Sequence, residues 1–190
     1  MAYTVKPLGP ELGQTFVDYL GSLDFHHAPH WSTCFCRFYY TDCSQEEWQN
    51  RTGEQNAKEA LQMISDGRMH GYLAFDRDTC IGWCCADDAK RFIRLKEDTQ
   101  PVIEGKKVGS ILCYVIRPEY RGQGVARLLL RKAVEDFREA GFDAVLTLPV
   151  DIKDDMEKRY RGTLHMYEEL GFEKIQQHGA LSVMWLDLKA

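Results

Sequence analysis

The sequence has no long apolar run and no surplus of positive charge. No apolar stretch approaches the roughly 20 residues that a membrane-spanning helix needs, and the start of the chain lacks the apolar core of a signal peptide. The formal net charge is −5, whereas a protein that binds nucleic acid usually carries a basic face. We therefore expect neither a membrane protein nor a nucleic-acid-binding protein, and we expect the chain in the cytoplasm.

Internal repeats, low-complexity stretches and recognisable interdomain linkers are also missing. The 190 residues are 44% hydrophobic and 28% charged, which are ordinary values for a globular protein. A chain of this length can bury a substantial core as one unit. We therefore predict a single domain that spans residues 1–190.

The sequence contains neither a recognisable disulfide framework nor a metal-binding motif. Its seven cysteines are an odd number, and Cys84 and Cys85 are adjacent within an apolar run. Residues 26–43 are rich in histidine and cysteine, which invites a zinc interpretation. However, one residue separates Cys34 from Cys36 where a zinc knuckle has two, and no second pair follows. We expect reduced thiols and no bound metal.

Hydrophobic periodicity divides the chain into strands and helices. Apolar runs bounded by turn residues predict strands at 3–8, 71–75, 80–85, 110–116, 144–150, 172–176 and 181–188. Helical spacing and two capping boxes, which begin at Ser44 and Thr52, predict helices at 10–20, after 44, from 52 to about 66, at 126–140 and at 164–170. Residues 87–108 are polar and predict a loop. Strand alternation puts Cys113 on the same face as Ile111 and Val115.

The clearest local pattern is the passage from the strand at 110–116 into the helix at 126–140. Pro118 ends the strand, and the glycine-rich turn Arg121-Gly122-Gln123-Gly124-Val125-Ala126 leads directly into the helix. The first amides of a helix are unpaired and carry a partial positive charge, and glycines let an anion approach the backbone. Arg121 adds a fixed charge. The turn therefore predicts a site for a pyrophosphate group.

Two common nucleotide motifs do not fit this turn. The dinucleotide fingerprint would need glycine at the position of Arg127, and a Walker loop would need a Gly-Lys-Ser/Thr sequence. The pattern Arg121-x-x-Gly124-x-Ala126 instead resembles motif A of the GNAT family of N-acetyltransferases. The segment Tyr167-Glu168-Glu169-Leu170-Gly171-Phe172 is similar to the Tyr-x-x-x-Gly-Phe segment of the same family.

This resemblance implies a fold and a division of labour along the chain. The implied fold is α/β (α+β), with one mixed, mostly antiparallel sheet of about six to seven strands flanked by about four helices. It implies an acetyl-CoA-binding core at about 71–188 and a helical segment on the acceptor side at about 10–66. Residues 26–43 would then form an aromatic, partly thiol-lined wall of the acceptor pocket.

The resemblance also implies site residues. The loop from Arg121 to Ala126 would bind the pyrophosphate of acetyl-CoA, and the backbone of Val115 and Ile116 would bind its thioester and pantetheine. Tyr167 would act as the general acid for the departing CoA thiolate, because a phenol is still protonated at neutral pH. Two positions depart from the family pattern, which often has asparagine where this chain has Tyr160 and alanine where it has Thr163.

The implied reaction is the transfer of an acetyl group from acetyl-CoA to a primary amine by direct attack. The alternative is a non-catalytic acyl-CoA-binding or sensor protein with the same fold. The sequence leaves open the acceptor, the acyl chain and a homodimeric state. Side chains that remain candidates for the general base are Asp87, Asp88 and His165, and those that remain candidates for phosphate contacts are Arg117, Arg127 and Arg131.

Overall fold

The computed structural model contains one seven-stranded sheet. It describes the chain except for residues 1–2, 27, 96–98, 100–101, 151–159 and 190. The strand order is β1-β2-β3-β4-β5-β7-β6, and only β4 and β5 run parallel. The strands are β1 (Thr4–Pro7), β2 (Gly71–Asp76), β3 (Thr79–Asp88), β4 (Val108–Ile116), β5 (Ala144–Thr147), β6 (Glu173–His178) and β7 (Leu181–Asp187). This confirms the predicted mixed, mostly antiparallel sheet.

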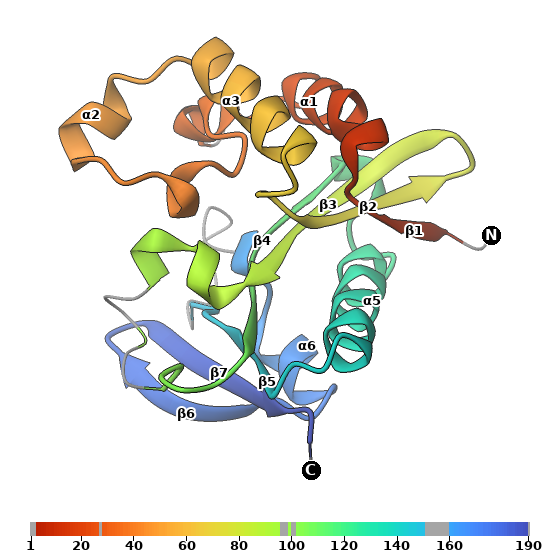
Figure 1. Cartoon of the computed structure of the whole chain (residues 1–190). Helices are drawn as coiled ribbons and strands as arrows, with labels where there is room; N and C mark the ends of the chain where they lie inside the picture. Colours follow the sequence, from red (N-terminus) through yellow and green to blue (C-terminus); the bar gives the residue numbers. More distant parts are fainter. Residues whose placement is uncertain (1–2, 27, 96–98, 100–101, 151–159, 190) are drawn as a thin grey trace.

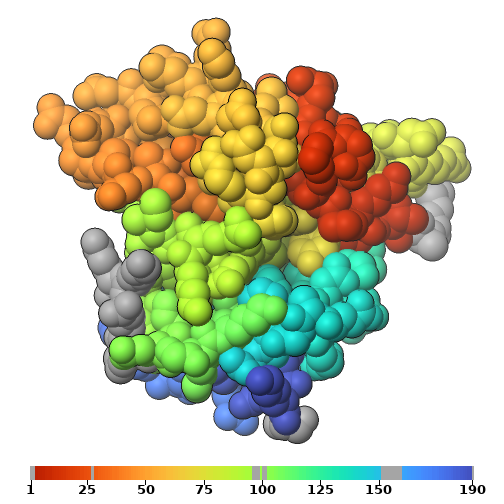
Figure 2. All heavy atoms as spheres, viewed as in Figure 1, coloured from red at the N-terminus to blue at the C-terminus, as the bar shows by residue number. Residues whose placement is uncertain are grey.

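Helices cover both faces of the sheet. One face packs against α1 (Gly13–Gly21) and α3 (Gly53–Ser65), with the short α2 (Gln45–Gln49) beside them. The other face packs against α5 (Val125–Glu139) and α6 (Leu164–Glu168). Figure 1 shows the first group above the strands and the second group beside and below them. In the space-filling view, the orange and yellow residues of α2 and α3 gather at the top of the molecule (Figure 2).

Local sequence signals explain where the helices begin and end. Both predicted capping boxes are present, since Ser44 and Glu47 bond each other's backbone amides, as do Thr52 and Gln55. The predicted apolar stripe of α5 is buried at Leu129, Leu130, Ala133, Val134 and Phe137. The stripe shifts at its ends, because Val125 is buried, Ala126 is half-buried and Ala140 is an exposed C-cap.

Strand β4 contains a bulge that the sequence did not reveal. Cys113 pairs with Cys85, but Ile111 pairs with the next residue, Ala86, so Leu112 is an extra residue. As a result, Cys113 and Val115 pack on the α1 side, whereas Ile111 packs on the α5 side. The prediction that Ile111 shares a face with Cys113 was therefore wrong, because strict alternation does not survive a bulge.

Several strand ends also differ from the prediction. The segment 87–108 was predicted as a loop, but Asp87 and Asp88 belong to β3 and Val108 belongs to β4. The strand predicted at 144–150 ends at Thr147, and only an isolated bridge joins Val150 to Leu181. The short β5 is important for the site, because β4 has no β5 partner beyond Ile111.

We predict that Gly109→Ala destabilises the protein by about 1–3 kcal/mol, the usual cost of overpacking a core. A Cβ atom at Gly109 would lie 2.7 Å from the ring of Phe137 on α5. Gly21→Ala is the matched control, because a Cβ atom there meets nothing within 4 Å and alanine favours the helix. Urea unfolding measures both variants, and equal stability of the two would contradict the close packing of β4 against α5.

Candidate functional site

The glycine-rich turn occupies the N-terminus of α5 as the sequence predicts. Gly124 is the N-cap with φ of 83°, and Gly122 also has a left-handed φ, of 74°. A Cβ atom at either position would meet nothing within 4 Å. The two glycines are therefore needed for their backbone conformation and for access to the first amides of α5, and not for packing.

A groove of about 290 Å³ runs from this turn along the end of β4. We call it the loop groove. One side consists of residues from β4 and the turn: Tyr114, Val115, Ile116, Tyr120, Arg121, Gly122, Gly124, Val125, Ala126 and Arg127. The other side consists of Phe25, Trp31, Tyr160, Gly162, Thr163 and Met166. The groove thus opens where β4 continues past the end of β5.

The loop groove brings together most of the sequence-predicted cofactor-binding residues. Val115, Ile116, Arg121, Gly122, Gly124, Val125 and Ala126 all line it. Gln123 does not, since its side chain accepts a hydrogen bond from Tyr3 and donates one to the carbonyl of Glu119. The Gln123 side chain therefore connects the turn to Tyr3.

Tyr167 lies behind the wall of the loop groove. Its side chain is fully buried, and its hydroxyl donates a 2.7 Å hydrogen bond to the carbonyl of Arg161. The hydroxyl of Tyr114, which lines the groove, is 3.5 Å away. Burial raises the pKa of Tyr167. The phenol is therefore protonated at neutral pH, as a general acid must be.

Gly162 separates the Tyr167 hydroxyl from the groove. A Cβ atom at this position would lie 2.8 Å from that hydroxyl, and the residue has φ of 79°. Glycine is thus required here by both space and backbone conformation. Because Gly162 has no side chain, the phenol lies only one residue behind the groove surface.

A second cavity of about 280 Å³ adjoins the loop groove. We call it the aromatic pocket. Its aromatic side chains are Phe25, Trp31, Phe35, Phe38, Tyr39, Trp48 and Tyr160, and its thiols are those of Cys34, Cys36, Cys85 and Cys113. The sequence predicted this aromatic and thiol wall from residues 26–43, but it did not predict that β3 and β4 contribute Cys85 and Cys113. Phe25, Trp31, Val115 and Tyr160 line both cavities.

Cys36 lies at the centre of the thiol group. Its Sγ accepts a 3.1 Å hydrogen bond from the indole nitrogen of Trp83. Phe35 and Cys36 both have left-handed φ values, of 44° and 51°, which are costly for residues with side chains. The thiols of Cys113 and Cys85, with the Trp83 indole, hold the pKa of Cys36 well below its usual range. Burial raises the pKa of neighbouring Cys34 to about 12.

The candidate bases from the sequence lie away from both cavities. Asp87 is buried and accepts a hydrogen bond from Tyr40, with His70 at 3.1 Å and Arg91 at 3.4 Å. His165 is exposed beside Glu169. Among the described residues that line the aromatic pocket, His30 is the only imidazole. His30 belongs to the segment 26–43 that was predicted to form the pocket wall, but no sequence pattern marks it as a candidate base.

Of the three arginines that the sequence offers as candidates for phosphate contacts, only Arg127 lines one of the two cavities. Arg127 lines the loop groove and pairs with Glu169 at 2.7 Å. Arg131 lies on the outer side of α5, and Arg117 donates to the carbonyl of Cys80. Within the part of the chain that the structure describes, no three His, Cys, Asp or Glu side chains are arranged to hold a metal ion, and no helix is long and apolar enough to cross a membrane.

Comparison with known proteins identifies this arrangement. Residues 29–172 match the model of the acetyltransferase (GNAT) family. The matched range includes the turn, β4, most of the aromatic pocket and the Tyr167 segment. A search of curated protein sequences finds no match.

Solved structures with the same fold align over almost the whole chain. The PaiA N-acetyltransferase of Thermoplasma acidophilum, solved with coenzyme A, has 16% identity and a TM-score of 0.58, and the alignment covers 98% of this chain and 99% of that one. The ribosomal-protein-S5-alanine acetyltransferase of Vibrio fischeri has 13% identity and a TM-score of 0.56, with coverage of 98% and 93%. A chain of the NatC complex bound to Gag peptide and CoA has 15% identity and a TM-score of 0.55, with coverage of 98% and 99%.

We predict that an alkylating reagent such as iodoacetamide modifies Cys36 faster than Cys34 at neutral pH. The lowered pKa of Cys36 favours the reactive thiolate, whereas the raised pKa of Cys34 keeps that thiol protonated. Site-resolved mass spectrometry after timed exposure measures both rates. Cys34 is the more exposed residue, so access alone would reverse the order, and faster labelling of Cys34 would contradict the prediction. Cys36→Ser provides the control for assignment.

Proposed function

This chain belongs to the GNAT acetyltransferase family, and we propose that it transfers the acetyl group of acetyl-CoA to a primary amine. One observation carries the proposal: the loop groove and the aromatic pocket meet at four shared residues, including Val115 and Tyr160. A donor in the groove and an acceptor in the pocket would then meet at the end of β4. The similar structures support this choice, because two of them were solved with CoA and a third is an alanine acetyltransferase.

The proposed donor position follows from the charges and amides of the loop groove. The pyrophosphate of acetyl-CoA would lie against the amides of residues 121–126 at the N-terminus of α5, with Arg121 and Arg127 at the rim. The pantetheine arm would follow β4, where no β5 partner uses the backbone beyond Ile111. An amide near Val115 or Ile116 that binds the thioester oxygen would lower the barrier by about 2.7–4 kcal/mol.

The proposed reaction is a direct attack. The neutral amine nitrogen bonds to the thioester carbon, and the carbonyl oxygen takes up the negative charge. When the C–S bond breaks, the CoA sulfur leaves as a thiolate and takes a proton from Tyr167. The amine loses its own proton to solvent, and solvent reprotonates the phenol. The position of Gly162 supports this role, because this glycine lines the groove and places no side chain between the groove and the Tyr167 hydroxyl.

A second candidate is a non-catalytic acyl-CoA-binding protein. The observation that favours it is the 2.7 Å hydrogen bond from Tyr167 to the Arg161 carbonyl, because a phenol in this position can serve packing alone. Release of CoA thiol from acetyl-CoA in the presence of amines distinguishes the two. Binding of acetyl-CoA without amine-dependent thiol release would support the second candidate.

We predict that Gly124→Ala weakens CoA binding about tenfold, because its methyl group would occupy the open space beside the turn where the pyrophosphate would bind. Gly141→Ala is the matched control at the opposite end of α5, with a similar φ of 72° and equally open space. Both variants should lose similar stability in thermal unfolding. Only Gly124→Ala should raise the Kd of CoA in calorimetry, and equal Kd values would remove the turn from the binding site.

We predict that Tyr167→Phe lowers kcat by about 100-fold, the usual contribution of a general acid, with little change in the Kd of acetyl-CoA. Tyr114→Phe is the control, because its hydroxyl is only 3.5 Å from that of Tyr167 and also borders the groove. That variant should retain most of the wild-type rate. Unchanged turnover in Tyr167→Phe would leave the phenol with a packing role.

A further inference from the structure

Several aromatic rings in the wall of the aromatic pocket pack against one another. Trp31 and Tyr160 make an edge-to-face contact at 4.9 Å, and Phe38 makes such contacts with Tyr39 and Trp48 at 5.3 Å each. Tyr160 comes from a distant part of the sequence, whereas the other four rings come from residues 31–48. Such contacts fix ring orientation, and they leave a surface to which another aromatic ring binds favourably.

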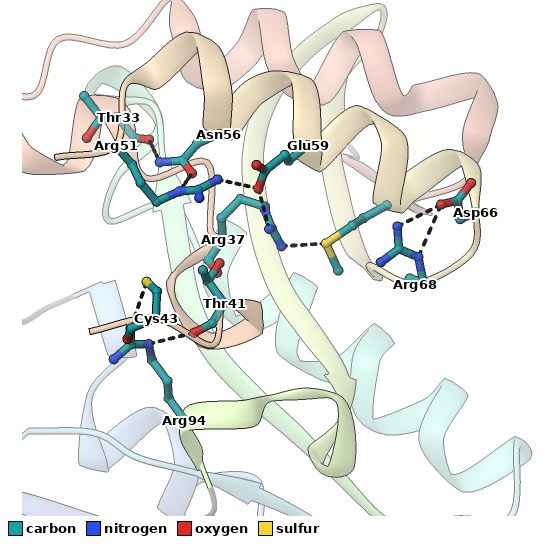
Figure 3. Close-up of polar contacts among 11 residues, drawn as sticks. Thr33, Arg37, Thr41, Cys43, Arg51, Asn56, Glu59, Asp66, Arg68 and Arg94 are labelled. Carbon is teal, nitrogen blue, oxygen red and sulfur yellow. Dashed lines mark hydrogen bonds and ion pairs between the residues drawn. The ribbon is translucent and has the colours of Figure 1, made fainter. Parts of the chain in front are cut away.

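Cations lie directly behind this wall. The guanidinium of Arg94 is 4.4 Å from the centre of the Phe38 ring and donates to the carbonyls of Thr41 and Cys43 (Figure 3). Arg161 lies 5.6 Å from the centre of Tyr39 and 5.2 Å from that of Tyr160. It donates to both phenol oxygens. None of the described carboxylates pairs with either arginine.

Two further arginines beside this wall add to the positive charge around the pocket. Buried Arg37 and half-buried Arg51 share a single carboxylate, that of Glu59 (Figure 3). The described residues that line the pocket include no Asp or Glu, and its polar side chains other than phenols and thiols are His30 and Gln45. Burial raises the pKa of Tyr39 and of Tyr160, so these phenols stay neutral.

From this wall and this charge distribution, we infer that the acceptor is an arylalkylamine, a primary amine on a short chain that ends in one aromatic ring and carries no second positive charge. The inference rests on the proposed acetyl transfer and names its substrate class. The ring would lie among Phe38, Tyr39 and Trp48, and the amine would point toward Val115, where the pocket meets the loop groove. A cavity of about 280 Å³ is suited to a small ligand.

The same surroundings account for a pocket whose described lining residues include no carboxylate base. An ammonium group that enters an apolar cavity among cations loses solvation and meets repulsion, so its pKa falls. The amine thus reaches the thioester in its neutral, nucleophilic form. A second ammonium on the same molecule would face the same penalty without any gain in reactivity.

The test compares three amines with acetyl-CoA: phenylethylamine, hexylamine and hexanediamine. The ring distinguishes the first from the second, and a second ammonium distinguishes the third from the second. We expect kcat/KM to fall about tenfold at each step, as one aromatic contact or one unfavourable charge would produce. Hexylamine equal to phenylethylamine would overturn the aromatic part, and hexanediamine equal to hexylamine would overturn the charge part.

These outcomes are distinct from a failure of the proposed function. If hexanediamine or another polyamine releases CoA thiol and phenylethylamine does not, the protein is an acetyltransferase and the inferred substrate class is wrong. If acetyl-CoA binds but no amine of a broad panel accelerates thiol release, the proposed function itself fails.

A pair of tryptophan variants locates the effect. Trp48 lines the aromatic pocket but not the loop groove. Trp185 is a half-buried residue of β7 whose ring lies against Lys106, and it lines neither cavity. Trp48→Ala should reduce the preference for phenylethylamine over hexylamine about tenfold and leave the Kd of CoA unchanged. Trp185→Ala should leave the preference unchanged. An unchanged preference in Trp48→Ala would show that the aromatic ring of the substrate does not bind beside Trp48.

Discussion

The site depends on the separation of two parallel strands. Strands β4 and β5 pair only from Val108 to Ile111, and Leu112 then bulges out of the ladder. Beyond that point β4 continues alone on its β5 side, and the cavity that opens there is bounded by the turn before α5. A bulge of one residue also reverses which side chains face each layer. It turns Cys113 and Val115 toward α1 and the aromatic pocket, whereas Ile111 stays under α5.

Much of this arrangement is predictable from short stretches of the sequence. The glycine turn, the stripe of α5 and the two capping boxes depend on neighbours within a few residues, so periodicity and turn chemistry predicted them. The seven strands were also placed within a few residues of their observed ends. The α/β class and the strand arrangement followed from the family resemblance, which the match over residues 29–172 supports.

Features that depend on long-range contact were not predictable in this way. The bulge at Leu112 leaves no mark in the apolar run from Ser110 to Ile116. The pairing of Asp87 with His70, Tyr40 and Arg91 requires three separate segments to converge, and so does the meeting of Cys36 with Cys85 and Cys113. Composition did not reveal the arginines behind the rings of the pocket either, because a net charge of −5 describes the whole chain and not one site.

The wall shared by the two cavities has a thermodynamic consequence. Trp31 and Tyr160 touch each other at 4.9 Å, and each borders both the loop groove and the aromatic pocket. A ligand that moves either ring in one cavity changes the shape of the other. Any such change is a coupling free energy, and it alters both affinities by the same factor. The packing of two side chains would then make the affinity for one ligand depend on whether the other ligand is bound.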